Sequence, residues 1–422
     1  MTRCFTAHFP EFRKNQVELL SLMVLALLRG KDVRHAELAA RFPGSAHTAS
    51  VIRRVERFFD RHPLRPADVA RVVLTLLPAA QPREFILDRT NWKYGQTDVN
   101  VLLLAVIWRD VAIPLLYELL PHGGSSDTEI RHTLMDDALC LLSAADIRVL
   151  YADREFVGYD WVQGLARRGI PICVRLRRDT LLDDWTAQDW LSRVQTGQAG
   201  LLVEDTVVYG QPMNVVLTYT QDGEALIIAS NAGAVTTIQS RYRRRFLIEC
   251  LFRALKSKGF HLEGTHMTLH DHVERLLCLL TLTYTWSVLV GCTLECPKKA
   301  HGRRAWSVVK MGLRELVRAF SRESACLCNL ITLLMPSHTL EVPRFCVPEE
   351  TPRQFKRGGV WESERGTAKS SSRRPSGSPK SRTGACSRSR RVWGSATRPC
   401  TAGSASSQGR EGRPFPGTGS RS

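Results

Sequence analysis

Apolar residues recur at helical spacing through most of residues 12–78. The run VELLSLMVLALLRG is followed by a Gly-Lys-Asp break, the segment HAELAARF, a PGSAHT turn and the segment ASVIRRVERFFDRH. The last segment carries one apolar stripe, formed by Val51, Ile52, Val55, Phe58 and Phe59. The pattern therefore predicts a helical N-terminal region.

Three basic residues, Arg53, Arg54 and Arg57, lie off this stripe. In one interpretation the segment is the second helix of a helix–turn–helix whose arginines contact DNA. In the other, these arginines form the solvated face of an ordinary helical bundle. The pattern alone leaves both interpretations open.

From residue 83 the pattern changes to short apolar runs separated by polar segments. REFILDRTNW is expected to be a strand, and VNVLLLAVIWRDVAIPLLYELLP two more strands joined by a turn at Arg109 and Asp110. A helix in SSDTEIRHTLMDDALCLLS, capped by Ser126 or Asp127, precedes a strand in ADIRVLYADREF. A helix in YDWVQGLARRG that closes on Gly169 precedes a fifth strand in IPICVRLRR. This order of elements is typical of an α/β sheet domain.

Residues 181–238 interrupt the α/β alternation with short β-rich runs separated by Gly and Asp turns, which indicates a β-rich insertion. A strongly charged helix is expected next, over residues 240–258, ending at Gly259. The following stretch, residues 276–292, has 17 residues and no charge, but it contains several hydroxyl side chains. We interpret it as a buried core helix rather than a membrane span.

The chain has 422 residues, of which 43% are hydrophobic and 24% charged, values that exclude whole-chain disorder and collagen-like repeats. Its 59 Lys and Arg outnumber 41 Asp and Glu, which gives a net charge of +18. This excess points to a polyanionic partner, with nucleic acid or an anionic membrane as candidates. Thirteen of the net charges lie in residues 351–422, a Ser-, Gly-, Arg- and Pro-rich segment with almost no Leu, Ile or Val.

That basic segment is expected to be disordered, because it has too little apolar surface to offset the entropy of ordering. It could be a nonspecific DNA-binding tail. Alternatively it is a frame-shifted or read-through extension without a selected role, since its composition changes so abruptly.

The twelve cysteines include no CxxC pair and no His at finger spacing, so we expect buried thiols in a reducing cytosol and no zinc site. The N-terminus, MTRCFTAHFPEFRKNQ, has no long apolar run and predicts no signal peptide. Both features predict a soluble cytoplasmic protein that does not associate with membranes.

Two acidic residues occupy matching positions in the expected sheet. Asp88 follows the apolar run EFIL and Asp153 follows IRVLYA, so each is placed at the C-terminal end of a strand and is followed by Arg. Functional groups gather at that edge of an open α/β sheet. The alternative for either residue is a turn-forming Asp that caps the next element.

The charged helix carries a third candidate group. Tyr242, Arg245, Glu249 and Lys256 are spaced by 3, 4 and 7 residues, which keeps them on one helical face, with Arg244 on the far side. We expect a separate apolar stripe to pack on the sheet, formed by Phe246, Leu247, Cys250, Leu251 and Ala254. The alternative is a solvated helix face with ordinary Arg–Glu pairing.

The spacing Tyr242-x2-Arg245-x3-Glu249-x6-Lys256 resembles the Tyr-Arg-Glu-Lys signature of bacterial DDE transposases of the insertion-sequence-four family. Asp88 in LDRTNWK and Asp153 in ADREFVG resemble that family's two catalytic aspartates, and the β-rich insertion before the Glu is also a family feature. The HGRRAW segment is similar to related members. The resemblance covers roughly residues 10–320, whereas the tail beyond about residue 350 does not resemble the family.

The resemblance implies that Asp88, Asp153 and Glu249 are catalytic residues that ligate Mg²⁺ or Mn²⁺, as two ions in a two-metal site. It implies that Tyr242, Arg245 and Lys256 contact DNA phosphates near the transposon end. Well-known relatives hold a flipped base on an aromatic residue, for which Trp185 and Trp190 are candidates, although each could equally pack in a small core.

These observations predict an α/β fold, a ribonuclease H-like mixed sheet flanked by helices, with a β-rich insertion before the last catalytic helix and a helical N-terminal domain. The expected domains are residues 1–80 for DNA binding, 81–180 with 239–345 for catalysis, 181–238 for the insertion and 346–422 for the tail.

The expected function is cut-and-paste transposition on inverted-repeat ends and target DNA, by a homodimer acting on the nucleoid. One rival is a catalytically inactive relative that binds DNA and inhibits transposition. A ribonuclease or repair nuclease is a weaker rival, because it would leave the charged helix unexplained.

Overall fold

The computed structural model describes residues 1–78, 82–194, 200–220, 222–297, 299–300, 302, 304–322 and 326–336, with the side chains of residues 322 and 326 excepted. The chain divides into two compact units, residues 1–350 and 351–422. The fold described below belongs to the first unit. The predicted disordered tail, residues 346–422, lies outside the described residues.

Five helices form the N-terminal region, as the apolar spacing predicts. They are α1 (Thr2–His8), α2 (Lys14–Gly30), α3 (His35–Ala40), α4 (Thr48–Arg61) and α5 (Pro66–Leu76). Helix α5 begins with Pro66, whose fixed φ and missing N–H suit the first helical turn. On α4 the predicted stripe is buried apart from the half-buried Ile52, whereas Arg53 and Arg57 are exposed.

After the N-terminal helices, the chain forms one eight-stranded sheet in the order β3-β2-β1-β4-β5-β10-β9-β8. Its first five strands are β1 (Arg83–Tyr94), β2 (Thr97–Trp108), β3 (Val111–Leu120), β4 (Ile147–Ala152) and β5 (Ile172–Arg175). β1, β2 and β3 are antiparallel neighbours, whereas β4 runs parallel to β1 and β5 runs parallel to β4. Helices α6 (Thr128–Leu139) and α7 (Tyr159–Arg167) make the connections to β4 and β5. The predicted mixed α/β sheet flanked by helices is confirmed.

The turn between β2 and β3 lies at Arg109 and Asp110, as predicted. Both residues have positive φ, 46° and 61°, which suits the right-handed twist of a two-residue hairpin. The first strand, in contrast, is longer than predicted. Asp88 lies in the middle of β1 rather than at its end, because residues 89–94 continue to pair with β2.

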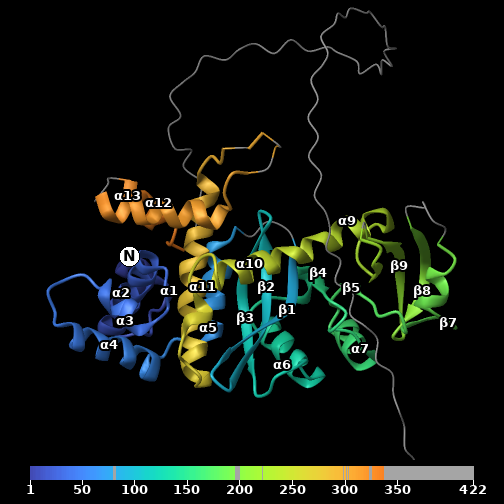
Figure 1. Cartoon of the computed structure of the whole chain (residues 1–422), viewed down its shortest axis with the longest axis horizontal. Coiled ribbons are helices and arrows are strands. Elements are labelled where there is room, and N and C mark those ends of the chain that lie inside the picture. Colours follow the sequence, from blue (N-terminus) through green and yellow to red (C-terminus); the bar gives the residue numbers. More distant parts are fainter. Residues whose placement is uncertain are drawn as a thin grey trace, which may run out of the picture. The chain divides into compact units, whose positions relative to one another are not determined.

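The β-rich insertion is not a separate layer. Its strands β8 (Leu201–Val208), β9 (Gln211–Tyr219) and β10 (Ala225–Ser230) continue the central sheet, since β10 pairs antiparallel with β5. The two-stranded β6 (Leu181–Leu182) and β7 (Trp185–Thr186) and the short helix α8 (Ala187–Leu191) connect β5 to β8. Figure 1 shows β8 and β9 at the far end of the sheet from the N-terminal helices.

The charged helix predicted over residues 240–258 is broken into three pieces. Helix α9 (Ile238–Tyr242) passes into a 3₁₀ turn, η3 (Arg243–Phe246), and then into α10 (Leu247–Leu255). The predicted packing stripe was wrong in part: Phe246 and Cys250 are exposed, and Ile248 and Leu255 are buried instead. A 3₁₀ turn advances about 120° per residue rather than about 100°, so it shifts the buried face of everything after it.

Helix α11 (His270–Thr293) is the predicted buried core helix. It has the length and composition to cross a membrane, but 89% of its most apolar window is buried inside the protein. Its buried hydroxyls are satisfied along the helix, since Thr283 donates to the Leu279 carbonyl and Ser287 to that of Thr283, each at 2.8 Å. Figure 1 shows α11 between the N-terminal helices and the sheet.

Two glycines allow α12 (Val308–Arg322) to pack closely against α11. A Cβ on Gly312 would lie 1.8 Å from the Ser287 carbonyl oxygen, and one on Gly291 would lie 2.1 Å from that of Val308. Trp286 on α11 donates from its indole N–H to the carbonyl of Leu330 in α13 (Cys326–Thr332). These contacts join the C-terminal helices to the core.

The described cysteines are all free, but the prediction of buried thiols holds for only some of them. Cys4, Cys173 and Cys278 are buried. Cys140, Cys250 and Cys328 are exposed.

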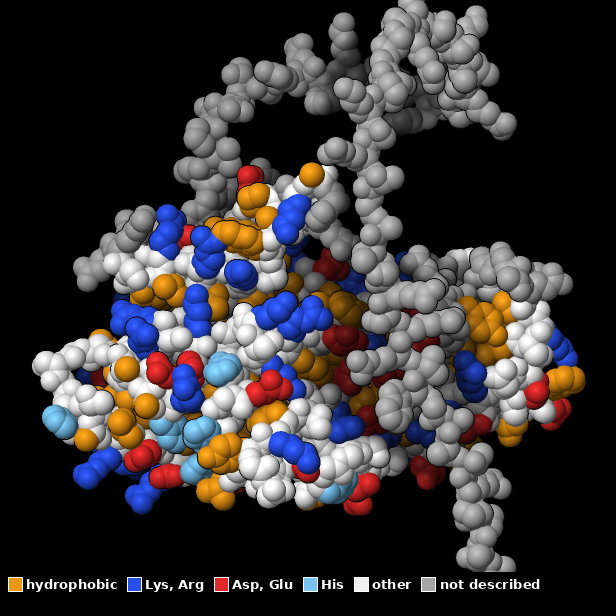
Figure 2. Space-filling view, viewed as in Figure 1, with side chains coloured by type: hydrophobic (Ala, Val, Ile, Leu, Met, Phe, Trp, Pro, Cys, Tyr) orange, Lys and Arg blue, Asp and Glu red, His pale blue; other side chains and the backbone are white. Residues whose placement is uncertain are grey.

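Side chains on the face seen in Figure 2 are unevenly distributed: Lys and Arg gather over α12 and the N-terminal helices, and Asp and Glu are visible in a recess over the middle of the sheet.

Candidate active site

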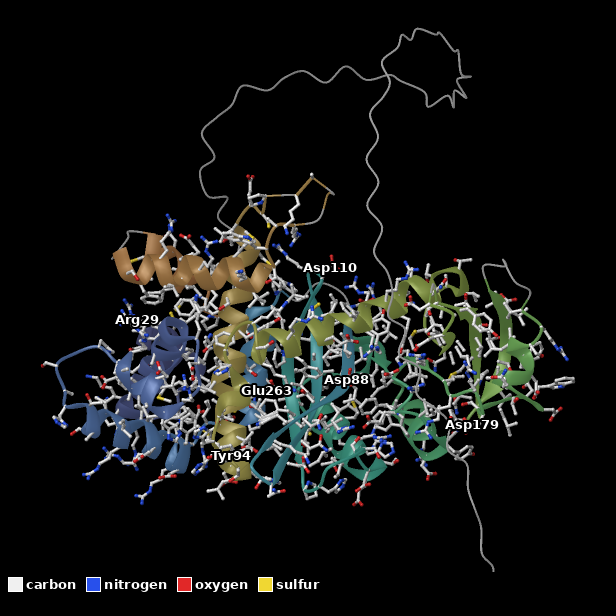
Figure 3. The ribbon with its side chains drawn as sticks, viewed as in Figure 1. Arg29, Asp88, Tyr94, Asp110, Asp179 and Glu263 are labelled. Carbon is white, nitrogen blue, oxygen red and sulfur yellow. The ribbon has the colours of Figure 1, made fainter. Side chains whose placement is uncertain are left out.

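Asp88 and Asp153 lie side by side in the sheet. The parallel pairing of β1 with β4 ends with Leu87 opposite Ala152, so the next residue of each strand is the aspartate. Neighbouring parallel strands lie about 4.8 Å apart, and residues at the same register project from the same face. Each aspartate accepts a hydrogen bond at 2.8 Å from the backbone N–H of the arginine that follows it. Figure 3 labels Asp88 near the middle of the sheet.

Glu249 is joined to this pair through Arg245. The Arg245 guanidinium donates from Nη1 to Asp88 Oδ2 at 2.9 Å and from Nη2 to Glu249 Oε1 at 2.7 Å. The Asp88 and Arg245 side chains are less than one fifth exposed, and that of Glu249 is 40% exposed. The structure therefore places the three predicted acidic residues and Arg245 in one site.

Tyr242 closes the site on the side of Asp153. Its side chain is buried, and its hydroxyl donates to Asp153 Oδ1 over 3.4 Å, a long hydrogen bond. Burial raises the pKa of the Tyr242 hydroxyl, and the neighbouring Asp153 carboxylate raises it further. Tyr242 therefore stays protonated and can donate its hydrogen bond at any physiological pH.

The surroundings of Asp88 disfavour its charged form. Burial raises the pKa of Asp88 to about 6; the Arg89 N–H and Arg245 oppose that shift, and the carboxylates of Asp153 and Glu155 add to it. Burial lowers the pKa of Arg245, but Tyr242, Asp153 and Asp88 outweigh it and hold the pKa above its usual value. Arg245 is thus a fixed positive charge beside Asp88, but it does not offset the burial that raises the pKa of that carboxyl.

The donor set suits a divalent cation in kind, because carboxylate oxygens are hard ligands for Mg²⁺ or Mn²⁺. In the described part of the chain, however, no three His, Cys, Asp or Glu side chains converge closely enough to hold a metal ion. The Arg245 guanidinium accounts for this, because it lies between Asp88 and Glu249. A metal held by Asp88 and Glu249 would have to take the place of this guanidinium.

Lys256 is not in this group. Its ammonium donates to the Asn91 carbonyl at 2.8 Å, pairs with Glu263 at 2.9 Å and lies 6.0 Å from the centre of the Trp92 ring. Asn91 is three residues further along β1 than Asp88. Lys256 is also the residue at which α10 ends, with φ −81° and ψ −102°, so it no longer shares the helical face of Glu249.

Arg244 differs from the sequence prediction too. Instead of facing solvent on the far side of the helix, it forms ion pairs with Glu84 on β1, at 2.5 Å, and with Asp110 in the β2–β3 turn, at 3.0 Å. Glu84 in turn accepts a hydrogen bond from the Tyr151 hydroxyl of β4. The 3₁₀ geometry of η3 explains the change, because it rotates Arg244 toward the sheet.

The sequence reasoning missed a second charged layer beneath the aspartates. Arg89 makes a two-point contact with Glu155, at 2.9 and 3.2 Å, and donates to the buried Asn100 amide oxygen at 3.1 Å. This contact ties the residue after Asp88 to the loop after Asp153. The signal was present in the sequence, since both aspartates are followed by arginine, in LDR and ADRE.

The two candidate aromatic residues of the insertion both flank Arg193. Its guanidinium carbon lies 4.2 Å from the Trp185 ring centre and 4.8 Å from that of Trp190. Trp185 is 49% exposed. Trp190 is half-buried. Neither tryptophan is fully enclosed in a core, so Trp185 is the more accessible of the two candidates.

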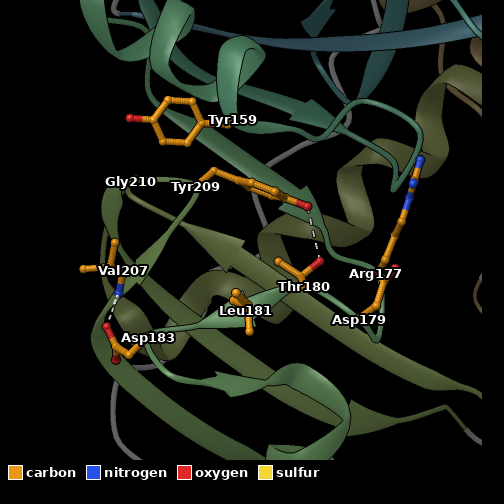
Figure 4. A pocket seen from close by; sticks show the side chains of 9 residues that line it. All are labelled: Tyr159, Arg177, Asp179, Thr180, Leu181, Asp183, Val207, Tyr209 and Gly210. Carbon is orange, nitrogen blue, oxygen red and sulfur yellow. Dashed lines mark hydrogen bonds between the residues drawn. The ribbon is translucent and has the colours of Figure 1, made fainter.

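A hollow of about 460 Å³ lies between α7 and the insertion, away from the carboxylates. Figure 4 shows Arg177 at one side of it and Tyr159 at the other, with Tyr209 between them. The Tyr209 and Thr180 hydroxyls lie 3.3 Å apart, and Asp183 accepts the Val207 N–H at 2.9 Å. These bonds join residues 180–183 to β8 and to the turn that follows it.

Residues 79–286 match the family model described as the transposase DDE domain, and this segment spans the sheet, the three carboxylates and most of α11. This match supports a DDE transposase domain over residues 79–286. The family model supports transposase function in DNA transposition and recombination.

Among solved structures, the chain is similar to a piggyBac transposase synaptic complex with hairpin DNA, at 11% identity and a TM-score of 0.37, over 80% of this chain and 79% of that chain. It is also similar to endonuclease V from Bacillus subtilis, at 13% identity and a TM-score of 0.21, over 54% of this chain and 94% of that chain. No curated protein matches the sequence.

Proposed function

We propose that this DDE transposase cuts DNA at the ends of its own insertion sequence and joins those ends to target DNA. The observation that carries the proposal is the placement of Asp88 on β1 beside Asp153, the residue directly after β4, with Glu249 linked to Asp88 through Arg245. The Tyr-Arg-Glu-Lys spacing supports membership of the insertion-sequence-four family.

Each residue has a distinct part in the proposed reaction. Asp88, Asp153 and Glu249 hold divalent metal, Mg²⁺ or Mn²⁺, which when bound activates the attacking water or 3′ hydroxyl and stabilises the leaving oxygen. Arg245 turns from the carboxylates to a DNA phosphate, for which its planar fork is suited. Tyr242 positions Asp153 through its hydroxyl.

The wider proposal concerns partners. Inverted-repeat ends and target DNA are the substrates, and a homodimer holds both ends in one complex on the nucleoid in the cytoplasm. Residues 1–80 are the proposed DNA-binding region, because exposed Arg53 and Arg57 lie on the outer face of α4.

The test is cleavage of duplex DNA that contains the element's ends, with Mg²⁺ or Mn²⁺. Asp88→Asn, Asp153→Asn and Glu249→Gln should each abolish cleavage and keep end binding, because each replacement removes a ligand oxygen with little change in shape. End binding without cleavage by the unaltered protein would favour the inactive DNA-binding relative. Cleavage without preference for inverted repeats would favour a general nuclease.

A further inference from the structure

Four arginines gather at the edge of the sheet beside Asp153. Arg154, Arg175, Arg177 and Arg178 line a cavity of about 320 Å³, together with Leu176, Glu224, Ala225 and Ile227. Glu224 is the single acidic residue in this lining, and its side chain is 73% exposed. Four like charges around one cavity repel one another unless an anion joins them.

Strand register explains why these arginines meet at the active site. The pairing of β4 with β5 ends with Ala152 opposite Val174, so the next residues, Asp153 and Arg175, lie side by side. Asp88, Asp153 and Arg175 therefore form one row across β1, β4 and β5. Strand β10 runs antiparallel to β5, so its first residue, Ala225, returns to the same edge.

The cluster is held by backbone contacts rather than by acidic partners. Arg177 donates to the Arg154 carbonyl at 3.2 Å, and Arg175 donates to the Ala225 carbonyl at 3.0 Å. Within the described part of the chain, one of these four arginines forms an ion pair: Arg175 lies 3.8 Å from Glu224. Arg154, Arg177 and Arg178 are exposed, so a ligand in solution can reach their guanidinium groups.

We propose that this arginine cluster binds the phosphates of the DNA strand that runs on from the reacting phosphate, and guides that strand from Asp153 toward the β-rich insertion. Guanidinium groups suit phosphate oxygens, because they donate two parallel hydrogen bonds. Arg177 lines both this cavity and the hollow of Figure 4, so the two cavities are neighbours, and a strand that leaves the cluster toward the insertion would pass Tyr159 and Tyr209. The inference rests on the proposed function, because it assigns DNA to the site.

The test compares two double variants with the same change in charge. Arg177→Ala/Arg178→Ala removes two exposed charges from the cluster. Arg167→Ala/Lys310→Ala removes two exposed charges elsewhere, at the end of α7 that lies at the opposite edge of the sheet and on α12. Binding to end-containing DNA is measured across a series of salt concentrations. The cluster variant should lower the salt slope by roughly 1.4 to 1.8, because each lost phosphate contact removes about 0.7 to 0.9, and the control variant should leave it unchanged.

Shortened DNA locates the contact. Two shortened substrates are used, each with DNA on only one side of the scissile phosphate. On the substrate that lacks the side reaching the arginines, the cluster variant should bind like the unaltered protein. Equal slopes for the two double variants, or a loss that persists on both shortened substrates, would overturn the inference. Failure of the unaltered protein to cleave would count against the proposed function alone, since the slope comparison needs no cleavage.

Discussion

Arg245 donates to Asp88 across 2.9 Å, so a side chain of the protein supplies positive charge where the reaction needs a cation. The same guanidinium reaches Glu249 with its other terminal nitrogen. Three nearby carboxylates would repel one another without such a charge. Under the proposed function, Arg245 organises the site before metal binds and releases both carboxylates when the metal takes its place.

This relationship predicts how Arg245→Ala changes metal binding. Without DNA, the variant should bind Mn²⁺ several-fold more tightly, because the ion no longer competes with the guanidinium for Asp88 and Glu249. End cleavage should fall all the same, since the phosphate contact is lost. Isothermal titration with Mn²⁺ measures the first effect. Weaker Mn²⁺ binding by Arg245→Ala would show that the guanidinium supports the metal rather than competing with it.

Arg244→Ala provides the neighbouring comparison. Arg244 pairs with Glu84 and Asp110 and touches none of the three carboxylates. Its loss should lower the free energy of unfolding by about 1 kcal/mol, the upper range for partly exposed ion pairs. Mn²⁺ affinity should not change. Urea unfolding and metal titration of the same sample separate the two effects, and a change in Mn²⁺ affinity as large as that of Arg245→Ala would contradict the assignment.

The raised pKa of Asp88 predicts a pH-dependent stability. Its pKa is about 6 in the folded protein against 3.8 for an ordinary Asp, so the folded state binds more protons between these values. The free energy of unfolding should therefore fall as pH rises from about 4 to about 6 and stay lower above that window. Asp88→Asn removes this contribution, which amounts to at most about 3 kcal/mol for a shift of roughly two units.

Unfolding in EDTA at pH 4.5, 6 and 7.5 tests this prediction. Because other groups also titrate, the quantity to follow is the difference between Asp88→Asn and the unaltered protein. The variant should be relatively more stable at pH 7.5 than at pH 4.5. A difference that does not vary with pH would mean that the Asp88 carboxylate is not destabilised by its surroundings.

That Asp88 and Asp153 lie next to each other could be predicted from the sequence, because the signal is local. Each aspartate follows an apolar run, and the register of β1 with β4 confirms that the two runs are neighbouring strands. The sequence predicted the end of β1 two residues too early, because Lys93 and Tyr94 are polar and are held in the strand by pairing with β2. It also missed the 3₁₀ turn at Arg243–Phe246, which tertiary contacts such as that of Arg244 with Glu84 stabilise.

Two substitutions of Tyr242 distinguish the contribution of its buried ring from that of its hydroxyl hydrogen bond. Tyr242→Phe keeps the buried ring and loses only a 3.4 Å bond to Asp153, so the free energy of unfolding should change by less than about 1 kcal/mol. Tyr242→Ala should cost about 3 to 5 kcal/mol, because it leaves a cavity in the core. If the hydroxyl positions Asp153, Tyr242→Phe should lower the cleavage rate and leave DNA affinity unchanged. Equal rates for Tyr242→Phe and the unaltered protein would remove that role.

Substitution of Lys256 distinguishes a residue that contacts DNA from one that holds two elements of the fold together. Its side chain is 19% exposed, and its ammonium already contacts the Asn91 carbonyl and the Glu263 carboxylate, so we expect it to hold the end of α10 against β1. Lys256→Met, which keeps the stem, should then lower the free energy of unfolding by about 1 kcal/mol. Glu263→Gln should produce part of the same loss, and the double variant should lose less than the sum of the two, because the partners share one interaction. The salt slope of DNA binding should change little in Lys256→Met. A fall of about 0.9 in that slope, with unfolding unaffected, would instead make Lys256 a phosphate contact, as the Tyr-Arg-Glu-Lys signature implies.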